Sequence, residues 1–287
     1  MDYLKRFMVE PGKKVKLDKI DPSFKDRHQD HASAQGEIDG YTSRLRELQY
    51  LLYAEGRHSL LIILQALDAG GKDGTINHVL GNMNPQGSRV CSFKAPTPKE
   101  LAHDFLWRIH QEVPKAGEVV VFNRSQYEDV LAARVHQLVP KKIWQERYRQ
   151  INDFEQLLAE NGTRILKFYL HIGKEEQLRR FRQRLEDPAR HWKISEADYR
   201  EREHWEEYQD AYEDALSLCS TPHAPWFVIP ADHKWFRNLA VSQIVVRTLE
   251  SLKMSFPEPA VDLAEISRRF HRELEAEERE NGAAKRK

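Results

Sequence analysis

The chain has 287 residues with 45 basic and 45 acidic side chains, so its formal net charge is zero. No global field therefore attracts nucleic acid, and a polyanionic partner would need a local basic cluster. Cys91 and Cys219 lie far apart, which excludes a disulfide framework and a zinc site of clustered cysteines and fits a reducing cytoplasm. The apolar run Leu60–Leu64 is too short to span a bilayer, so we expect a cytoplasmic globular protein without membrane or nucleic-acid partners.

Residues 1–35 are polar, which favours an arm lying on the domain over a core element. Four lysines gather in this arm: Lys13, Lys14, Lys16 and Lys19. Residues 36–55 carry apolar residues at helical spacing. The short apolar run His58–Gln65 that follows is typical of a strand buried on both faces, as in a parallel sheet.

Four later segments also have the apolar character of strands: Arg89–Phe93, Glu118–Asn123, Thr163–Ile172 and Pro225–Pro230. Helical segments separate them, and this alternation predicts an α/β fold with a central, parallel, five-stranded sheet flanked by helices. Residues 174–218 are too long for a simple crossover and predict a basic helical lid that projects from the sheet. The expected organisation is an arm at 1–35, the α/β domain at 36–255, and a charged C-terminal helix and tail at 256–287.

Single residues indicate several helix boundaries. Thr97 is a good cap, because a proline follows it and a glutamate lies three residues further on. We expect that helix to continue to at least Ile109. Further helices are expected from about Tyr127, and from Pro140 to Gly162.

The segment from Ala66 to Thr75 follows the first strand and leads into a helix. Gly71 and Lys72 match the end of the phosphate-loop pattern G-x-x-x-x-G-K-[ST], but Ala66 replaces its first glycine and Asp73 its final hydroxyl residue. Small residues let backbone N–H groups turn toward one anion, the helix N-terminus adds positive potential, and Lys72 supplies a point charge. The alternative is an ordinary glycine-rich turn.

The mismatch at Asp73 means that another carboxylate has to hold magnesium, and Asp68 inside the loop is the obvious candidate. The loop residues expected to bind phosphate are Ala69, Gly70, Gly71, Lys72, Asp73, Gly74 and Thr75.

A second polar segment, Phe122–Asp129, follows the third strand. Ligands of open α/β sheets lie beyond the carboxyl ends of the strands, so this segment and the glycine-rich loop should converge. Arg124 can neutralise a transferring phosphoryl group, and Asp129 or Glu128 can reach a metal or an acceptor. Arg134 lies a little further on as another phosphate-binding candidate. The alternative is a helix start whose acidic residues suit the helix dipole.

Residues 174–193 concentrate basic side chains. Phosphoryl transfer uses cations that close over the reacting oxygens and exclude water, so this segment is a natural lid. We expect Arg179, Arg182 and Lys193 to bind phosphate. For any single arginine, a solvated helix face with pairs four residues apart is the preferred alternative.

Together these motifs resemble the polyphosphate kinase 2 family, over about residues 10 to 255. The resemblance is carried by Asp68–Thr75, Phe122–Asp129, Arg134–His136, Arg184–Pro188, His191–Lys193, Ala224–Ala231 and Lys234–Asn238. It implies a phosphate-loop kinase fold related to thymidylate kinase, with a helical lid. It also implies magnesium, with manganese as a substitute, phosphoryl transfer between inorganic polyphosphate and nucleotides, and a homodimer or homotetramer.

Family members commonly carry Asp-Arg-Ser in the second motif, where this chain has Asn-Arg-Ser from Asn123 to Ser125. That resembles the subgroup that phosphorylates both AMP and ADP, a phosphotransferase class with a phosphate group as acceptor. The missing carboxylate at 123 shifts the expected metal ligands to Asp68 and Asp129. The expected catalytic residues are Asp68, Lys72, Arg124 and Asp129. The expected nucleotide-binding residues are Asp73, Asn123 and Glu128.

Two other functions remain open from the sequence. One is an ATP-dependent kinase acting on a small acceptor, although the lysines from Lys13 to Lys19, with Lys141 and Lys142, favour a long anionic donor. The other is a nucleotide-binding protein without catalysis, and the sequence contains no Asn-Lys-x-Asp segment of the kind GTPases use.

Overall fold

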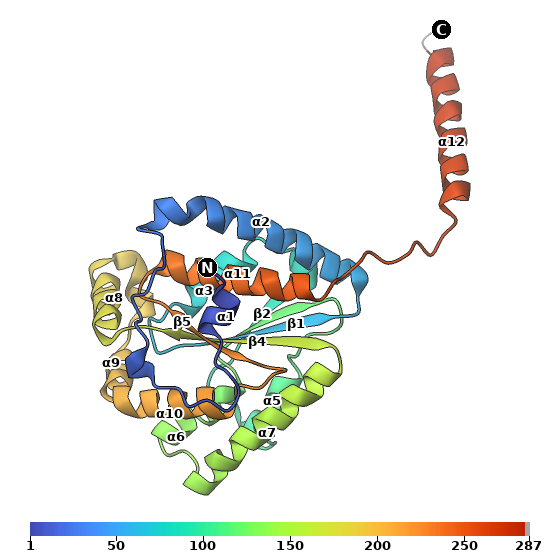
Figure 1. Ribbon diagram of the computed structural model, residues 1–287. Coiled ribbons are helices and arrows are strands. Elements are labelled where there is room, and N and C mark those ends of the chain that lie inside the picture. The colour runs from blue at the N-terminus through green and yellow to red at the C-terminus, as the bar shows by residue number, and fades with distance from the viewer. Residues whose placement is uncertain (285–287) are drawn as a thin grey trace. The chain divides into compact units, whose positions relative to one another are not determined.

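Five strands form one sheet in which all neighbouring strands are parallel, in the order β2-β3-β1-β4-β5 (Figure 1). They are β1 Ser59–Gln65, β2 Ser88–Ser92, β3 Val119–Asn123, β4 Thr163–His171 and β5 Trp226–Pro230. The structure, a computed structural model, describes residues 1–284. The predicted parallel α/β sheet is confirmed, because the five apolar runs are the five strands.

The helices cover both faces of the sheet, which is why the strands are apolar throughout. On β1, Leu60, Ile62 and Leu64 pack into one core, while Leu61 and Ile63 pack into the other. The first core is covered by α1 Tyr3–Phe7, α2 His31–Glu55, α3 Lys72–Leu80 and α11 Lys234–Ser251. The second is covered mainly by α7 Lys141–Glu160 and α10 Trp205–Leu218.

The prediction of one helix from Thr97 to Ile109 is wrong. The cap at Thr97 is present, but α4 (Pro98–Leu101) ends after one turn and α5 (Trp107–His110) begins a new one. The Asp104 side chain accepts from the backbone N–H of Leu106 at 3.0 Å, which starts a separate turn. A separate turn therefore begins at Asp104, after the first helix has ended.

The helix expected from about Tyr127 is also broken into two short pieces. They are η3 Gln126–Asp129 and α6 Ala132–Val135. Tyr127, Val130 and Leu131 are buried. Tertiary packing therefore decides the conformation of this segment. Two further 3-10 turns are η1 Leu17–Lys19 and η2 Pro85–Gly87.

The region predicted as a lid divides into two parts. Helix α10 buries Ala211, Tyr212 and Leu216 in the core, so it belongs to the helical layer and does not project. The remaining part contains α8 Lys174–Glu186, η4 Pro188–Lys193 and α9 Glu196–Glu203. Neither η4 nor α9 has a buried residue, so the segment free of the core is shorter than predicted.

The N-terminal arm lies along the edge strand β5 and over α11. Val9 donates its backbone N–H to Trp226 O at 2.8 Å, and Tyr3 packs edge-to-face on Phe236. The arm therefore covers the outer edge of β5 at its start.

Residues 1–254 and the residues from 255 onward form separate compact units. The second unit contains α12 Leu263–Ala284. The last three residues of the predicted tail lie outside the described residues. No helix in the described part of the chain combines the length and the apolar character needed to cross a bilayer.

Candidate active site

The loop between β1 and α3 has a shape that only small residues allow. Gly71 is the residue before the helix and has φ +104°, in the left-handed region that favours glycine. A Cβ atom on Gly70 would lie 2.6 Å from the Ala66 Cβ, so that position also requires glycine. The loop thus folds tightly enough to direct backbone N–H groups toward one point, as phosphate binding requires.

Lys72 begins α3 and its side chain returns across the loop. Its Nζ donates to Ala66 O at 2.8 Å, and Thr75 Oγ1 donates to Gly71 O at 3.2 Å. Burial lowers the pKa of Lys72, and this effect exceeds that of the nearby Asp68 charge, which raises the pKa. The ammonium group is therefore held within the loop, where a phosphate oxygen can replace its carbonyl partner.

The second motif meets this loop, as the sheet order predicts. Asn123 Nδ2 donates to Asp73 Oδ1 at 3.0 Å, and Arg124 Nη2 lies 3.4 Å from Asp68 Oδ1. Arg124 has φ +64°, a conformation that is costly for a residue with a Cβ and that clusters at active sites. The end of β3 therefore directs an amide and a guanidinium at the two aspartates of the loop.

Glu128 and Asp129 are neighbours that point in different directions. Burial lowers the pKa of Arg124, but the nearby charges of Glu128 and Asp68 raise it, and the net shift is upward. Asp129 instead forms an ion pair with Arg147 at 3.2 Å and lies 4.0 Å from Arg108. Glu128 and Asp129 both line the cavity beside the loop, but the carboxylate of Asp129 is engaged by two arginines and that of Glu128 lies nearer Arg124. Asp129 as a metal ligand therefore stays a prediction, and the structure adds Glu128 as a second candidate. In a tight 3-10 turn adjacent side chains point about a third of a turn apart.

The predicted lid cations are placed unequally. Lys193 Nζ lies 3.9 Å from Asp73 Oδ2 and so reaches the loop. Arg179 is paired with Glu176 on its own helix, and Arg182 is exposed near Glu186. Arg179 and Arg182 therefore pair with carboxylates on their own helix at its solvated face, which is the alternative given for any single arginine of this segment.

Arg134 is also engaged away from the loop. Its Nη1 donates to Asp214 Oδ2 at 2.6 Å, and its guanidinium lies 4.8 Å from the ring centre of Trp144. These contacts tie α6 to α10 and α7. The structure therefore gives Arg134 a packing contact and leaves its expected contact with phosphate untested.

Two buried arginines next to the loop had no role in the sequence-based prediction. Arg180 on α8 donates to Ala69 O at 2.8 Å and to Ala231 O at 2.6 Å. Arg237 on α11 is 2% exposed, and its Nη1 would lie 1.8 Å from a Cβ added to Gly71. Both guanidinium groups therefore lie directly against the backbone of the phosphate loop.

Arg237 has no carboxylate partner among residues 1–284. Its Nε and Nη2 donate to Asn238 Oδ1 at 3.1 and 2.8 Å. Burial, and then the charge of Arg180, lowers its pKa to about 9. Burying an uncompensated cation is costly, so this arrangement indicates a site that an anion completes. The sequence offers one weak signal, because Arg237 lies among apolar residues of α11, whereas the second arginine of that helix, Arg247, is exposed.

A cavity of 590 Å³ opens beside the loop, between the second motif and the lid. Its lining contains many charged side chains, among them Asp68, Arg108, Arg124, Glu128, Asp129, Arg147, Asp198, Glu201 and Arg202. Aromatic and apolar side chains line it as well: Phe93, Leu101, Trp205, Tyr208 and Tyr212. A cavity that combines apolar surface with charged groups beside the loop has the size and chemistry to hold a nucleotide.

Within the described residues, no three or more His, Cys, Asp or Glu side chains gather as a metal site. Magnesium beside substrate phosphates needs only one or two protein carboxylates, since phosphate oxygens and water complete its shell. Asp68, with 26% of its side chain exposed, and Glu128 both line the cavity at the loop. The carboxylates present therefore fit a magnesium ion that arrives with phosphate.

A glycine-lysine loop after the central strand of a parallel sheet, facing a second polar loop that carries Arg124 and a basic lid, defines a phosphate-loop kinase. Residues 25–257 match the family model of polyphosphate kinase 2, and the chain belongs to that family. The predicted family is thereby confirmed. Kinases of this family generally need a divalent metal.

Related proteins and structures resemble nearly the whole chain. An AMP/ADP-polyphosphate phosphotransferase of Meiothermus ruber is 51% identical over 89% of this chain and 96% of its own length. An ADP-polyphosphate phosphotransferase of Rhodopseudomonas palustris is 47% identical over 88% of this chain and 92% of its own length. The crystal structure of polyphosphate kinase 2 from Arthrobacter aurescens matches 96% of this chain and 97% of that one, with 42% identity and a TM-score of 0.90.

Proposed function

We propose that this protein transfers the terminal phosphoryl group of inorganic polyphosphate to AMP and to ADP, reversibly. The observation that carries the proposal is the phosphate loop, with Lys72 inside it and Arg237 buried against it without a carboxylate partner, beside a cavity of nucleotide size. The names of the two relatives, each about half identical, support polyphosphate as donor and both nucleotides as acceptors.

In this proposal the loop holds the end of the polyphosphate chain. Backbone N–H groups of residues 69–75 and the ammonium group of Lys72 bind the phosphoryl oxygens, and Arg124 follows the group as it moves. The nucleotide lies in the cavity with its terminal phosphate oxygen in line with the bond that breaks. Asp73, Asn123 and Glu128 orient it from the loop side.

The chemistry needs no general base, because the attacking phosphate oxygen of AMP or ADP is already ionised. One phosphoanhydride bond of the donor breaks, one forms on the nucleotide, and the shortened polyphosphate leaves as an anion. Like bonds are exchanged, so the transfer runs in both directions. Catalysis is then positioning and charge neutralisation in a site that excludes water.

Magnesium, with manganese as a substitute, would be held by Asp68 with Glu128 as the second carboxylate. When bound, it supplies positive charge to the phosphate oxygens of both substrates. The salt bridge between Asp68 and Arg124 keeps the carboxylate aligned until the substrates arrive.

A matrix of donors and acceptors tests this function. AMP, ADP, GMP and GDP are each supplied with polyphosphate or with ATP, in the presence of magnesium, and products are separated by chromatography. We expect ADP and ATP to form from polyphosphate. Transfer from ATP alone would establish the ATP-dependent kinase, and tight nucleotide binding without transfer would establish a non-catalytic protein.

The predicted homodimer or homotetramer and the cytoplasmic location stay predictions. Sedimentation equilibrium of the purified protein measures the first, and fractionation of the source cells measures the second.

A further inference from the structure

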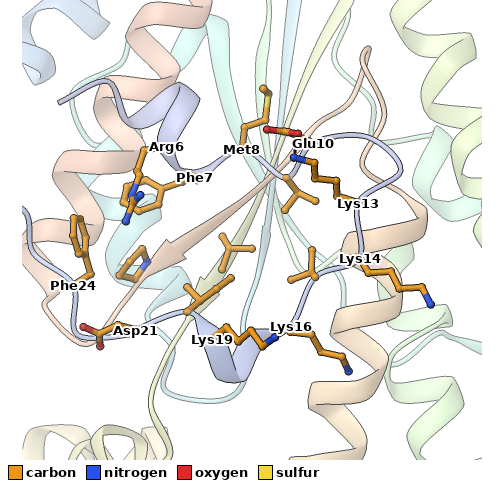
Figure 2. Close-up of a pocket in the computed structure, with 15 residues that line it drawn as sticks. Arg6, Phe7, Met8, Glu10, Lys13, Lys14, Lys16, Lys19, Asp21 and Phe24 are labelled. Atoms are coloured by element: carbon orange, nitrogen blue, oxygen red, sulfur yellow. Dashed lines mark ion pairs between the residues drawn. The ribbon is translucent and has the colours of Figure 1, made fainter.

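A second cavity, of 560 Å³, lies under the N-terminal arm and outside the site described above (Figure 2). Its floor is apolar and comes from both the arm and the edge strand β5, including Val15, Ile20 and Val228. Five basic residues line it: Arg6, Lys13, Lys14, Lys16 and Lys19. Only two acidic residues, Glu10 and Asp21, line it with them. The cavity is therefore positive in a chain without net charge.

The arm around this cavity is fixed at several points. The backbone N–H of Leu17 donates to Glu213 Oε1 at 2.8 Å, and that of Val15 donates to Ser217 Oγ at 2.9 Å. At the other side Ser220 Oγ donates to Val9 O at 2.6 Å. The backbone that carries the lysines is thus held before any ligand binds, which lowers the entropic cost of binding.

Part of this positive charge has no partner within the protein. Lys13 pairs with Glu10, and Lys16 pairs with Glu213 at 2.6 Å. Lys14 and Lys19 have no carboxylate partner among the residues that the structure describes. Both side chains are exposed, so their ammonium groups are available to an anion.

The cavity is connected to the phosphate loop through a short series of contacts. Pro22 O, next to the lining residue Asp21, accepts from the backbone N–H of Asp232 at 3.1 Å. Arg180 donates both to Asp232 O at 2.9 Å and to Ala69 O of the loop at 2.8 Å. The arm and the loop therefore contact the same few residues.

More cations lie along this connection. Burial, and then the charges of Arg180, Arg190 and Arg237, lower the pKa of Lys234, while the charge of Glu176 raises it. Arg180 and Arg237 are themselves buried, so they contribute positive charge beneath the surface between the loop and the arm.

We propose that the arm cavity binds a distant stretch of the same polyphosphate chain whose end occupies the phosphate loop. This rests on the proposed function, in which polyphosphate is the donor. A long chain contacts the loop and the arm together, whereas a short chain fills the loop alone. The arm then raises the affinity for long donors without taking part in the transfer, by the effective concentration of a second contact.

The test is the double variant Lys14→Ala/Lys19→Ala, with Lys115→Ala/Lys253→Ala as the control. The control removes the same charge from two exposed lysines that line neither cavity. We expect the KM for long-chain polyphosphate to rise about fivefold in the arm variant. The slope of log KM against the logarithm of the salt concentration should become shallower by about 1.4, as for two lost phosphate contacts. The KM for tetrapolyphosphate and the kcat with either donor stay the same.

Other outcomes overturn the inference. Equal changes for long and short donors, or the same changes in the control variant, would show that the arm cavity is not a separate subsite. Loss of ATP affinity with an unchanged KM for long polyphosphate would assign the cavity to a nucleotide. If the wild-type protein accepts no phosphate from polyphosphate of any length, the proposed function fails and this inference fails with it. Both variants are checked for an unchanged melting temperature.

Discussion

Lys72 lies across the phosphate loop with its ammonium group on Ala66 O, in the position where a phosphate oxygen would bind. Replacing it by alanine removes the central point charge but no core packing. We expect Lys72→Ala to lower kcat about 100- to 1000-fold, the usual cost of losing one group that stabilises transition-state charge. Near-normal turnover with polyphosphate and ADP would contradict the assignment. An unchanged melting temperature is the control for folding.

Glu128 and Asp129 provide a matched pair of carboxylates in one turn. Glu128 faces Arg124, and Asp129 faces Arg147 and Arg108. We therefore expect Glu128→Gln to raise the magnesium concentration needed for half-maximal activity, and Asp129→Asn to leave it nearly the same. The opposite result would favour Asp129 as the metal ligand. Magnesium titrations of the two variants, side by side, decide between them.

Arg237 carries a buried charge that has no carboxylate partner among the described residues and that only an anion can offset. Arg237→Met removes that charge and keeps most of the side-chain volume. We expect this variant to melt at a higher temperature than the wild type without ligand, because the uncompensated cation is gone. Polyphosphate should then stabilise it less, and its KM for polyphosphate should rise. If the Arg237→Met variant melts at a lower temperature without ligand and its KM for polyphosphate is unchanged, the role of Arg237 is purely structural.

Individual site residues differed in how well the sequence predicted them. Lys72 could be predicted from the glycine-lysine motif, and Arg124 from its place just after a strand. The order of the strands in the sheet then brings the two residues together. Arg237 is far from both in the sequence, and its place against Gly71 arises only when α11 packs over the loop. The orientations of Glu128 and Asp129 depend on one turn of backbone, which motif spacing does not specify.

At the scale of elements, a buried ion pair holds the second motif in place. Lys167 on β4 and Glu155 on α7 are both fully buried and form a salt bridge. Glu155 also accepts from Tyr127 Oη at 2.9 Å and from Gln126 Nε2 at 3.0 Å. The turn between Arg124 and Glu128 is thereby fixed to the sheet.

Breaking this pair on one side leaves a buried charge without a partner. We expect Lys167→Met to lower the free energy of unfolding by about 3 to 5 kcal/mol, and Glu155→Leu to do much the same. Combining the two should recover much of the loss, since an apolar pair of similar volume replaces the ions. Urea unfolding of the three variants measures this coupling, and simple additivity of the single losses would refute it.

The strands were predictable because continuous apolar runs suit a sheet covered on both faces. The short helices were not, because competing local contacts determine them. The side chain of Asp104 starts a new turn after the helix that ends at Leu101. The burial of Tyr127 holds its segment in a 3-10 turn. The lid was predicted too long for a related reason. Its last helix packs an apolar face on the core and so belongs to the domain, and the charge of the segment does not show where the core-packed part begins.

At the scale of the whole molecule, the division after Met254 can be tested directly. We expect a protein that ends at Met254 to keep its melting temperature within about 2 °C and to retain phosphotransfer, because the core and the candidate site lie in residues 1–254. Differential scanning calorimetry and the assay with polyphosphate and ADP measure both. A large loss of either would place α12 within the functional unit.

The arm that covers β5 also sets an order of events during synthesis. Tyr3 donates its backbone N–H to Gln243, and Val9 pairs with Trp226, so the arm binds residues that are synthesised more than 200 positions after it. Until β5 and α11 have been made, the arm lacks these partners. The domain therefore closes late in its synthesis, and a chain terminated before β5 leaves the arm accessible to proteases.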